Sequence, residues 1–366
     1  MHILASIGFL LVFVSALIFM HVYPMQKLLG LSAEALTQAG LAVPTHKALS
    51  LSFSLCLVFL VMLAFMLGTF FPKGVLGTLH KISSFWLGAL FIFFFVVLCV
   101  DLIGRFLPIT PFWQIVLICV CTTTLLILGI DQGTKISIKT TTITTPKISK
   151  AYRLILLSDL HLGYQSAQNV ATIVSKVKKL KPHAVLITGD LIDSNAFLPD
   201  DLLAFNELSV PIYYTFGNHE FYIKKGVPEH AISQTNIQLL RNQRAELDEL
   251  QIWGVDDNRH DDLEAQLKQI SIDKQGFTIL MKHSPTQINK AAKRGVDLVL
   301  SGHTHGGQIF PFNFLVRIFY HYVAGLYEVK GTKLYVTEGT SFWGPPIRLG
   351  THNEIAVIEL KPTKTR

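Results

Sequence analysis

The chain has 366 residues, of which half are hydrophobic and only 16% are charged, and its net charge is +7. Soluble globular proteins carry about a quarter charged residues, so this composition excludes an ordinary, fully soluble protein. No Lys- and Arg-rich run with interleaved aromatic side chains is present, and we therefore expect no nucleic-acid partner. A modest basic excess is typical of a membrane protein with positive cytoplasmic loops.

Charged residues are scarce before about residue 131 and ordinary in number after it. This asymmetry predicts a transmembrane domain over residues 1–131 and a second domain over residues 132–366. A helix needs about 20 apolar residues to cross a bilayer, and four stretches are long enough. They cover residues 3–23, 49–71, 82–102 and 109–130. No charged residue lies deep inside them, which argues against a transporter.

Four crossings put both ends of the chain on the same side of the membrane. Basic residues are more numerous on that side, so the positive-inside rule places the second domain in the cytoplasm. The basic residues of that side are Lys73, Lys81, Lys135, Lys139, Lys147 and Lys150, and those of the other side are Lys27, Lys47 and Arg105.

Beyond residue 135, short β-rich runs alternate with helix-like stretches. A Thr-rich segment at residues 140–145 predicts an edge strand, and residues 167–180 follow a helical pattern. Continuous apolar strands that alternate with helices predict an α/β domain whose sheets are covered. The other expected strands are residues 153–158, 183–188, 212–216, 250–255, 277–281, 298–301, 334–337 and 355–360.

Polar groups follow five of these strands, and ligand groups of α/β folds gather at the carboxyl ends of strands. Each fragment alone is weak, because an Asp after Gly is usually a turn residue. Together they supply at least two Asp, one Asn and four His without a thiolate, which fits a catalytic two-metal site better than a structural zinc. The fragments are DLH at 159–161, GDLID at 189–193, GNHE at 217–220, KH at 282–283 and GHTHGG at 302–307.

This ordered set resembles the calcineurin-like metallophosphoesterase superfamily, from Asp159 to His305 and onward to the C-terminus. The segments GHTHGGQ and WGPPIRLG are further similar to the bacterial membrane-associated branch of that family. The resemblance implies a four-layer αββα sandwich that follows the four-helix transmembrane region. It also implies an integral protein of a bacterial inner membrane.

The resemblance implies two divalent cations, drawn from manganese, iron, zinc or magnesium, with manganese favoured. One cation would be held by Asp159, His161, Asp190 and His305, and the other by Asp190, Asn218, His283 and His303. Asp190 would therefore bridge the two. A hydroxide between the cations would attack phosphorus in line.

In the same resemblance, His219 is not a ligand but the general acid that protonates the leaving oxygen. Asp193 would orient His219 and keep it cationic. Two simpler interpretations stay open. Asp193 could be a turn residue, and Glu220 could be an acid at the start of a helix.

An aromatic-rich segment at residues 308–327 directly follows the last ligands. It could pack in the core, or it could form an apolar, membrane-facing lip that admits a lipid tail. We take Phe312 as a candidate contact for a lipid tail on such a lip. We take Arg348 as a candidate contact for the phosphate, because Arg suits phosphate binding. Arg348 could equally be a surface charge.

We therefore expect a membrane-anchored dinuclear-metal phosphoesterase that hydrolyses phosphate esters, with a lipid or nucleotide-linked lipid among the candidate substrates. One alternative is a phosphatase of soluble nucleotides or phosphoproteins. Another is a non-catalytic sensor or receptor that uses the metal domain only to bind a ligand. The intact ligand set together with His219 argues against the sensor. The oligomeric state stays open.

Overall fold

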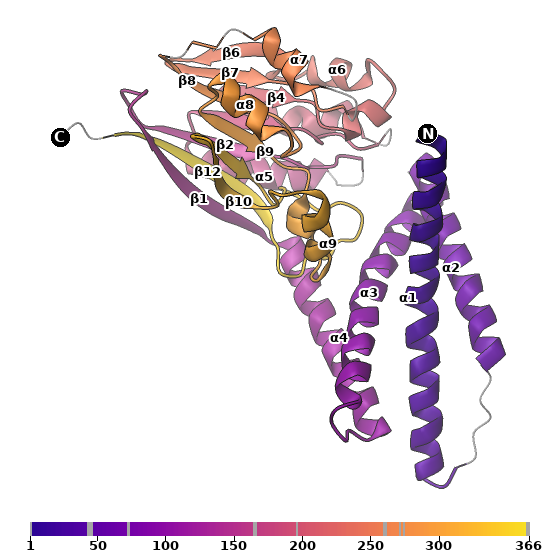
Figure 1. Ribbon diagram of the computed structural model, residues 1–366. Coiled ribbons are helices and arrows are strands. Elements are labelled where there is room, and N and C mark those ends of the chain that lie inside the picture. The colour runs from indigo at the N-terminus through magenta and orange to yellow at the C-terminus, as the bar shows by residue number, and fades with distance from the viewer. Residues whose placement is uncertain are drawn as a thin grey trace. The chain divides into compact units, whose positions relative to one another are not determined.

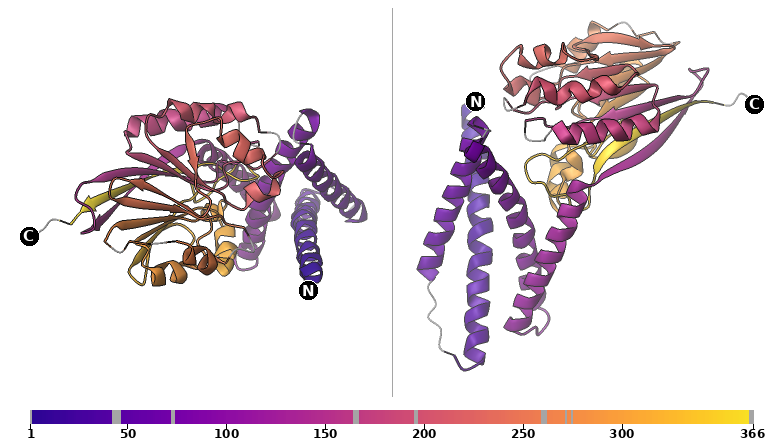
Figure 2. Two further views of the ribbon diagram at one scale, coloured as in Figure 1. Left: turned by 90° about the horizontal axis from the view of Figure 1, so that it is seen from above. Right: turned by 180° about the vertical axis from the view of Figure 1, so that it is seen from behind.

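The computed structural model describes residues 2–41, 47–71, 74–163, 167–194, 197–258, 262–270, 272–273 and 275–363. The chain divides into two compact units, seen as long helices and as a layered body in Figures 1 and 2. The first unit contains Met1–Ile130 together with Gly344–Ile347. The second contains Asp131–Trp343 together with Arg348–Arg366.

The first unit is built from four helices, each long and apolar enough to cross a membrane. This agrees with the four apolar stretches predicted from the sequence. The helices are α1 (His2–Gln38), α2 (Lys47–Phe70), α3 (Gly74–Gly104) and α4 (Pro111–Thr134). Their outward side chains are largely apolar and exposed, as expected of surfaces that face lipid rather than water.

The predicted end of the first helix at Tyr23 was wrong, because α1 continues through Pro24 to Gln38. Lys27 therefore lies within the helix and not in a loop. A cation in an apolar membrane-spanning helix costs free energy. The Asp101 carboxylate of α3 offsets this cost, because it forms an ion pair with Lys27. Asp101 also accepts a hydrogen bond from the Tyr23 hydroxyl at 2.9 Å and one from Arg105 at 3.0 Å. Lys73, which we counted as a loop charge, lies outside the described residues.

The described part of the second unit contains two six-stranded sheets. The first has the strand order β1-β12-β2-β3-β4-β5, and the second has the order β10-β11-β9-β8-β7-β6. The strands of the first sheet are β1 (Ile136–Thr145), β2 (Tyr152–Leu157), β3 (Ala184–Thr188), β4 (Ile212–Thr215), β5 (Ile237–Leu239) and β12 (Asn353–Pro362). Those of the second are β6 (Gln243–Leu247), β7 (Leu250–Gly254), β8 (Phe277–Met281), β9 (Leu298–Ser301), β10 (Gly325–Val329) and β11 (Thr332–Val336).

Helices cover the outer face of each sheet, and three apolar cores separate the layers. The first core packs α5 (Ala167–Leu180), the 3₁₀-helix η1 (Pro199–Glu207) and α6 (Val227–Ile232) on the first sheet. The second lies between the two sheets. The third packs α7 (Leu263–Lys268) and α8 (Ile288–Arg294) on the second sheet. This αββα arrangement confirms the expected fold class.

The second unit begins at the end of α4, since only Lys135 separates that helix from β1. β1 pairs in parallel with β12 along ten residues and forms an edge of the first sheet, as the Thr-rich segment predicted. The Asn353 side chain donates a hydrogen bond to the Gly133 carbonyl at 2.6 Å. The last turn of α4 is thereby fixed to the start of β12.

Candidate metal centre

The loops that follow β2, β3, β4, β8 and β9 carry the seven predicted ligands. In parallel strands these loops emerge at one edge of the sheets, and β2, β3 and β4 are parallel neighbours, as are β8 and β9. Two short helical turns hold the loops, η2 (His219–Tyr222) after β4 and η3 (His305–Gly307) after β9. The sequence thus brings ligands from distant segments to one place.

Six of the seven predicted ligands form two groups, and within each group the ligand atoms lie inside 4.8 Å of one another. His161, Asp193 and His219 form a third group of this kind among the described residues. In the first group, His305 Nε2 is 3.4 Å from Asp159 Oδ1 and 3.2 Å from His161 Nε2. These three residues are the first predicted ligand set, apart from Asp190, which both predicted sets share.

In the second group, His283 Nε2 is 2.9 Å from Asp190 Oδ2 and 3.1 Å from His303 Nδ1. The groups adjoin each other, because His283 Nε2 also lies 4.0 Å from Asp159 Oδ1. Two cations held here would be close enough to act on one phosphoryl group.

Five of the candidate ligands have a backbone conformation that L-residues rarely adopt. Each has a positive φ, of 58° at Asp159, 51° at His161, 51° at Asp190, 73° at His303 and 50° at His305. Residues held in this way cost free energy and gather at functional sites. These five residues lie in the loops that directly follow β2, β3 and β9.

Two polar groups indicate that the residues present fit divalent cations. His283 Nδ1 lies 2.7 Å from the Thr188 carbonyl, so this nitrogen donates a proton there, and Nε2, which faces Asp190, is the nitrogen that could bind a cation. The Asn218 Oδ1 atom is buried and has no hydrogen-bond partner among the described residues. Such an acceptor is rare in a folded protein, and a cation would satisfy it.

Small residues are needed where the loops approach each other. A Cβ atom at Gly217 would lie 2.7 Å from the Asp190 backbone nitrogen and 2.9 Å from His283 Cγ. Real Cβ contacts are longer than 3.0 Å. The glycine before Asn218 therefore allows the β4 loop to reach the ligands of two other strands.

Glu220, which we considered only as an acid at a helix start, joins two of these loops. Its buried carboxylate accepts hydrogen bonds from the backbone N–H groups of Gly217 at 2.8 Å, Asp190 at 3.1 Å and Ile192 at 3.0 Å. Burial raises the pKa of this carboxyl group. No sequence pattern predicted these contacts, because two of the three partners, Asp190 and Ile192, belong to another loop.

His219 and Asp193 lie beside the ligand groups. His219 Nδ1 is hydrogen-bonded to Asp193 Oδ1, and the second Asp193 oxygen is 3.1 Å from His161 Nδ1. His219 Nε2 points toward the centre, 3.7 Å from Asp190 Oδ2. Asp193 therefore contacts both the candidate ligand His161 and the candidate acid His219. These two contacts are not explained by a turn role alone.

The charges at this pair oppose the effect of burial. Burial lowers the pKa of His219, but the Asp190 and Asp193 carboxylates outweigh it and raise the pKa to about 9. Burial raises the pKa of Asp193, but His161 and His219 outweigh it and lower the pKa to about 2. The pair is accordingly an imidazolium and a carboxylate at neutral pH.

Two of the other imidazoles differ from His219 in charge. Burial lowers the pKa of His303 to about 4 and that of His305 to about 3, so both are neutral, as metal ligands must be. Burial also lowers the pKa of His283, but the Asp190 carboxylate outweighs it and raises the pKa to about 10. A proton and a cation compete for that nitrogen.

Arg348, expected as a substrate contact, is fully buried. Its guanidinium donates to the carbonyls of His305, Glu338 and Ser341 at 3.1, 2.7 and 2.6 Å, and to Asn353 Oδ1 at 2.7 Å. With these acceptors around it, the guanidinium has no open face for a phosphate. We therefore correct the expected role of Arg348 as a substrate contact. Arg348 fixes the loop that carries His305.

Phe312 begins α9 (Phe312–Phe319), the helix that follows the last ligands, and its side chain is exposed. Core packing of this aromatic segment is excluded for α9, since none of its residues is buried. Tyr320 directly follows the helix, and its hydroxyl lies 2.7 Å from His303 Nε2. Because Nδ1 of His303 faces the ligand group, this contact orients the imidazole from behind.

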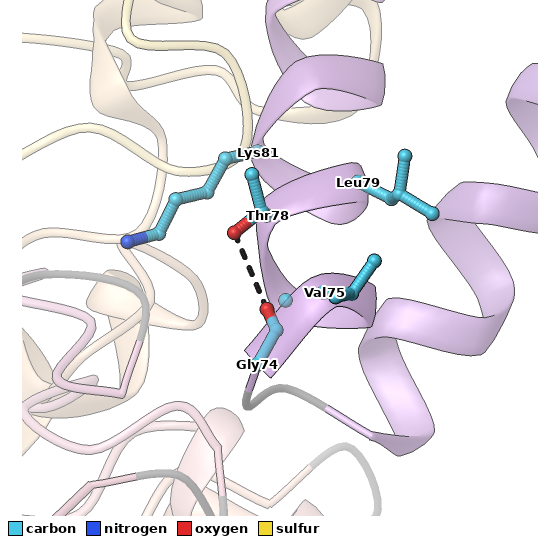
Figure 3. Close-up of a pocket in the computed structure, with 6 residues that line it drawn as sticks. Gly74, Val75, Thr78, Leu79 and Lys81 are labelled. Atoms are coloured by element: carbon cyan, nitrogen blue, oxygen red, sulfur yellow. Dashed lines mark hydrogen bonds between the residues drawn. The ribbon is translucent and has the colours of Figure 1, made fainter.

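A hollow of about 640 Å³ beside the first turns of α3 shares no residue with the ligand groups (Figure 3). Gly74, Val75, Gly77, Thr78, Leu79 and Lys81 line it. Thr78 and Lys81 have the only polar side chains among these lining residues. The Thr78 hydroxyl donates a hydrogen bond to the Gly74 carbonyl at 3.2 Å. Without a carboxylate or an imidazole, it carries none of the chemistry of the metal centre.

Comparison with known proteins agrees with this geometry. Residues 152–307 match the family described as calcineurin-like phosphoesterase. The metallophosphoesterase Cj0846 of Campylobacter jejuni is 36% identical over 248 residues, which cover 62% of this chain and 64% of that protein. The chain therefore spans a little less than two thirds of the length of that relative.

Two other relatives are covered more fully. A metallophosphoesterase of Aquifex aeolicus is 32% identical over 238 residues, which cover 60% of this chain and 90% of that protein. The transmembrane protein with metallophosphoesterase domain of Danio rerio is 30% identical over 314 residues, which cover 74% of this chain and 70% of that protein. The resemblance drawn from the sequence motifs is thus confirmed.

Proposed function

Because the chain belongs to the calcineurin-like phosphoesterase family, we propose that it is a membrane-anchored enzyme that hydrolyses phosphate esters with two divalent cations. The observation that carries the proposal is the pair of adjoining ligand groups, Asp159–His161–His305 and Asp190–His283–His303. Carboxylate and imidazole ligands without thiolate favour manganese, iron, zinc or magnesium, and we take manganese first.

When bound, the two cations would supply a hydroxide nucleophile near neutral pH and would neutralise phosphoryl oxygens. The residues of the chain hold and orient this chemistry. Asn218 is proposed to add its buried amide oxygen to the second group, and Asp190 is proposed to bridge the groups. Glu220 and Arg348 keep the loops of Asp190 and His305 in place.

His219 is proposed as the general acid that protonates the leaving oxygen. Its Nε2 faces the centre while Asp193 holds Nδ1, which leaves one N–H directed at the substrate. The neighbouring carboxylates keep the ring protonated, since they raise its pKa to about 9. Asp193 acts through His219 and is a positioning residue.

We place the second unit on the cytoplasmic side of a bacterial inner membrane. Lys135, Lys139, Lys147 and Lys150 follow the last span, in keeping with the positive-inside rule. Lys27 and Arg105, assigned above to the opposite side, both pair with Asp101. A reporter enzyme or fluorescent protein fused at the C-terminus tests the orientation, and a signal only from the outer side would contradict it.

For the substrate, we propose a phosphoester carried by a lipid or a nucleotide-linked lipid. The exposed apolar side chains of α9, close to the ligand His303 through Tyr320, support this class. Phe312, at the start of that helix, stays the proposed apolar substrate contact. A soluble nucleotide or phosphoprotein is the second candidate class, and relative turnover of the two classes decides between them.

The test compares p-nitrophenyl phosphate with bis-p-nitrophenyl phosphate as substrates of the detergent-purified protein, with and without added manganese. Asp190→Asn and His219→Ala are the variants, and Asp200→Asn, at an exposed position of η1, is the matched control. We expect metal-dependent turnover that both variants lose and the control keeps. Absence of metal binding by the intact protein would overturn the proposal.

A further inference from the structure

We propose that α9 and the two residues before it, Phe310 and Pro311, form a bilayer-docking face. The apolar side chains of this face insert into the lipid–water interface. The face consists of Phe310, Phe312, Phe314, Leu315, Ile318 and Phe319, all of which are exposed large hydrophobic residues. Ile318 and Phe319 are the most exposed, at 73% and 79%. The proposed occupant is the bilayer in which the chain is itself anchored.

The arrangement of these side chains is that of an interfacial helix. Positions 314, 315, 318 and 319 lie on one side of an α-helix, since residues three and four apart are neighbours on its surface. Asn313 and Arg317 lie on the other side, and Arg317 is exposed. An apolar stripe bordered by a cation fits the interface of an anionic membrane, with the aromatic rings at headgroup level.

Hydrogen bonds within the second unit place this face close to the point where the chain leaves a membrane span. The Gln132 side chain, in the last turn of α4, accepts a hydrogen bond from the Gly350 backbone at 3.2 Å. The neighbouring Leu349 carbonyl accepts one from the Phe310 backbone at 2.9 Å. Two short steps therefore connect the end of a candidate span with the start of the docking face.

This proximity is what selects a bilayer over another protein as the occupant. α4 is long and apolar enough to cross a membrane, and it ends at Thr134, two residues after Gln132. The docking face thus lies within the second unit near the residues that continue into that span. An exposed apolar cluster of this size is otherwise rare on a protein surface in contact with water.

The docking face also has a direct connection to the metal centre. Tyr320 follows Phe319, and its hydroxyl is hydrogen-bonded to the ligand His303. A phosphoester that stays in the bilayer would reach the cations beside α9 without leaving the interface. This last step rests on the proposed function, whereas the docking itself does not.

Bilayer insertion is tested on the full chain in liposomes of phosphatidylcholine and phosphatidylglycerol. The native cysteines, all of which lie in the first unit, are replaced by alanine, and Ile318→Cys carries a nitroxide spin label. Leu203→Cys, at an exposed apolar position of η1, is the matched control. We expect the label at 318 to be more accessible to dissolved oxygen than to a water-soluble nickel complex. The label at 203 should show the reverse. Equal access of the nickel complex to both labels would overturn the docking.

A second measurement uses Ile318→Asp beside Leu203→Asp. We expect Ile318→Asp to lower turnover of a vesicle-borne phosphoester by about tenfold and to leave turnover of p-nitrophenyl phosphate unchanged. Equal loss on both esters would contradict a role of the docking face in substrate access. A label inside the bilayer with no turnover of either ester would leave the docking intact and refute the proposed function instead.

Discussion

The Glu220 carboxylate accepts a hydrogen bond from the Asp190 backbone N–H at 3.1 Å, so a residue outside the ligand set fixes the backbone of the proposed bridging ligand. The same carboxylate holds the N–H groups of Gly217 and Ile192. Three buried donors converge on two oxygens, and the loops after β3 and β4 are thereby joined into one rigid wall of the metal centre.

Glu220→Gln should lower metal affinity by roughly 10- to 100-fold while the fold is retained. The amide has one acceptor oxygen where the carboxylate has two, and its NH₂ group would face a backbone donor. Metal content after dialysis against a weak chelator measures the effect. Glu249→Gln is the control, because Glu249 also accepts backbone N–H groups but at an exposed loop. Unchanged metal content in Glu220→Gln would refute the role of the carboxylate.

Asp193→Asn should reduce kcat by about a hundredfold on esters with a poor leaving group and far less on p-nitrophenyl esters. The amide no longer keeps His219 cationic, and only a poor leaving group needs the proton. The slope of turnover against leaving-group pKa is the measurement, with Asp200→Asn beside it. If both ester types lose activity equally, Asp193 serves the metal ligand His161 and not the acid.

Arg348→Met should destabilise the second unit by about 3 kcal/mol and weaken metal binding. The methionine fills the space but leaves several buried carbonyl oxygens without their donor. Chemical denaturation followed by intrinsic fluorescence gives the free energy of unfolding, and Arg317→Met, at an exposed position, is the comparison. Full stability of Arg348→Met combined with a raised KM would restore the substrate contact that we rejected.

Gly217→Ala should abolish metal binding by the second unit. The added methyl group would meet the Asp190 backbone and the His283 ring, and neither can move without displacing a ligand. Gly30→Ala is a suitable control, since a Cβ atom there has no neighbour within 4 Å. Tight manganese binding by Gly217→Ala in a calorimetric titration would show that the β4 loop can move away from Asp190 and His283.

The sequence was most informative where strands are buried on both faces. β2, β3, β8 and β9 are continuous apolar runs, and their positions were predicted to within a residue or two. β5, β6 and β10 were missed because they are short, partly polar and half exposed. Their pairing in the sheets comes from neighbouring strands and not from their own composition.

The candidate ligands could be chosen from the sequence, because Asp, Asn and His beside glycines at several strand ends are typical of a metal centre and of few other sites. Glu220, Tyr320 and the true position of Arg348 could not, since each acts through contacts with another segment. Arg348 did carry one usable signal. It stands between Ile347 and Leu349, and such apolar neighbours favour burial over an exposed charge. For α9, the aromatic residues were noted in the sequence, but only the structure shows that they form a helix that no core covers.

The pairing of β1 with β12 has a consequence for biosynthesis. β12 lies between β1 and β2, yet it follows every other described strand in the chain. While the ribosome is still translating, β1 emerges from α4 without its neighbour, and the first sheet stays open at that side. The ligand loops can therefore gain their final support only after translation of residues 353–362. An open strand next to a membrane is a site for chaperone binding, and a stop codon before β12 would leave an anchored chain that quality-control proteases recognise.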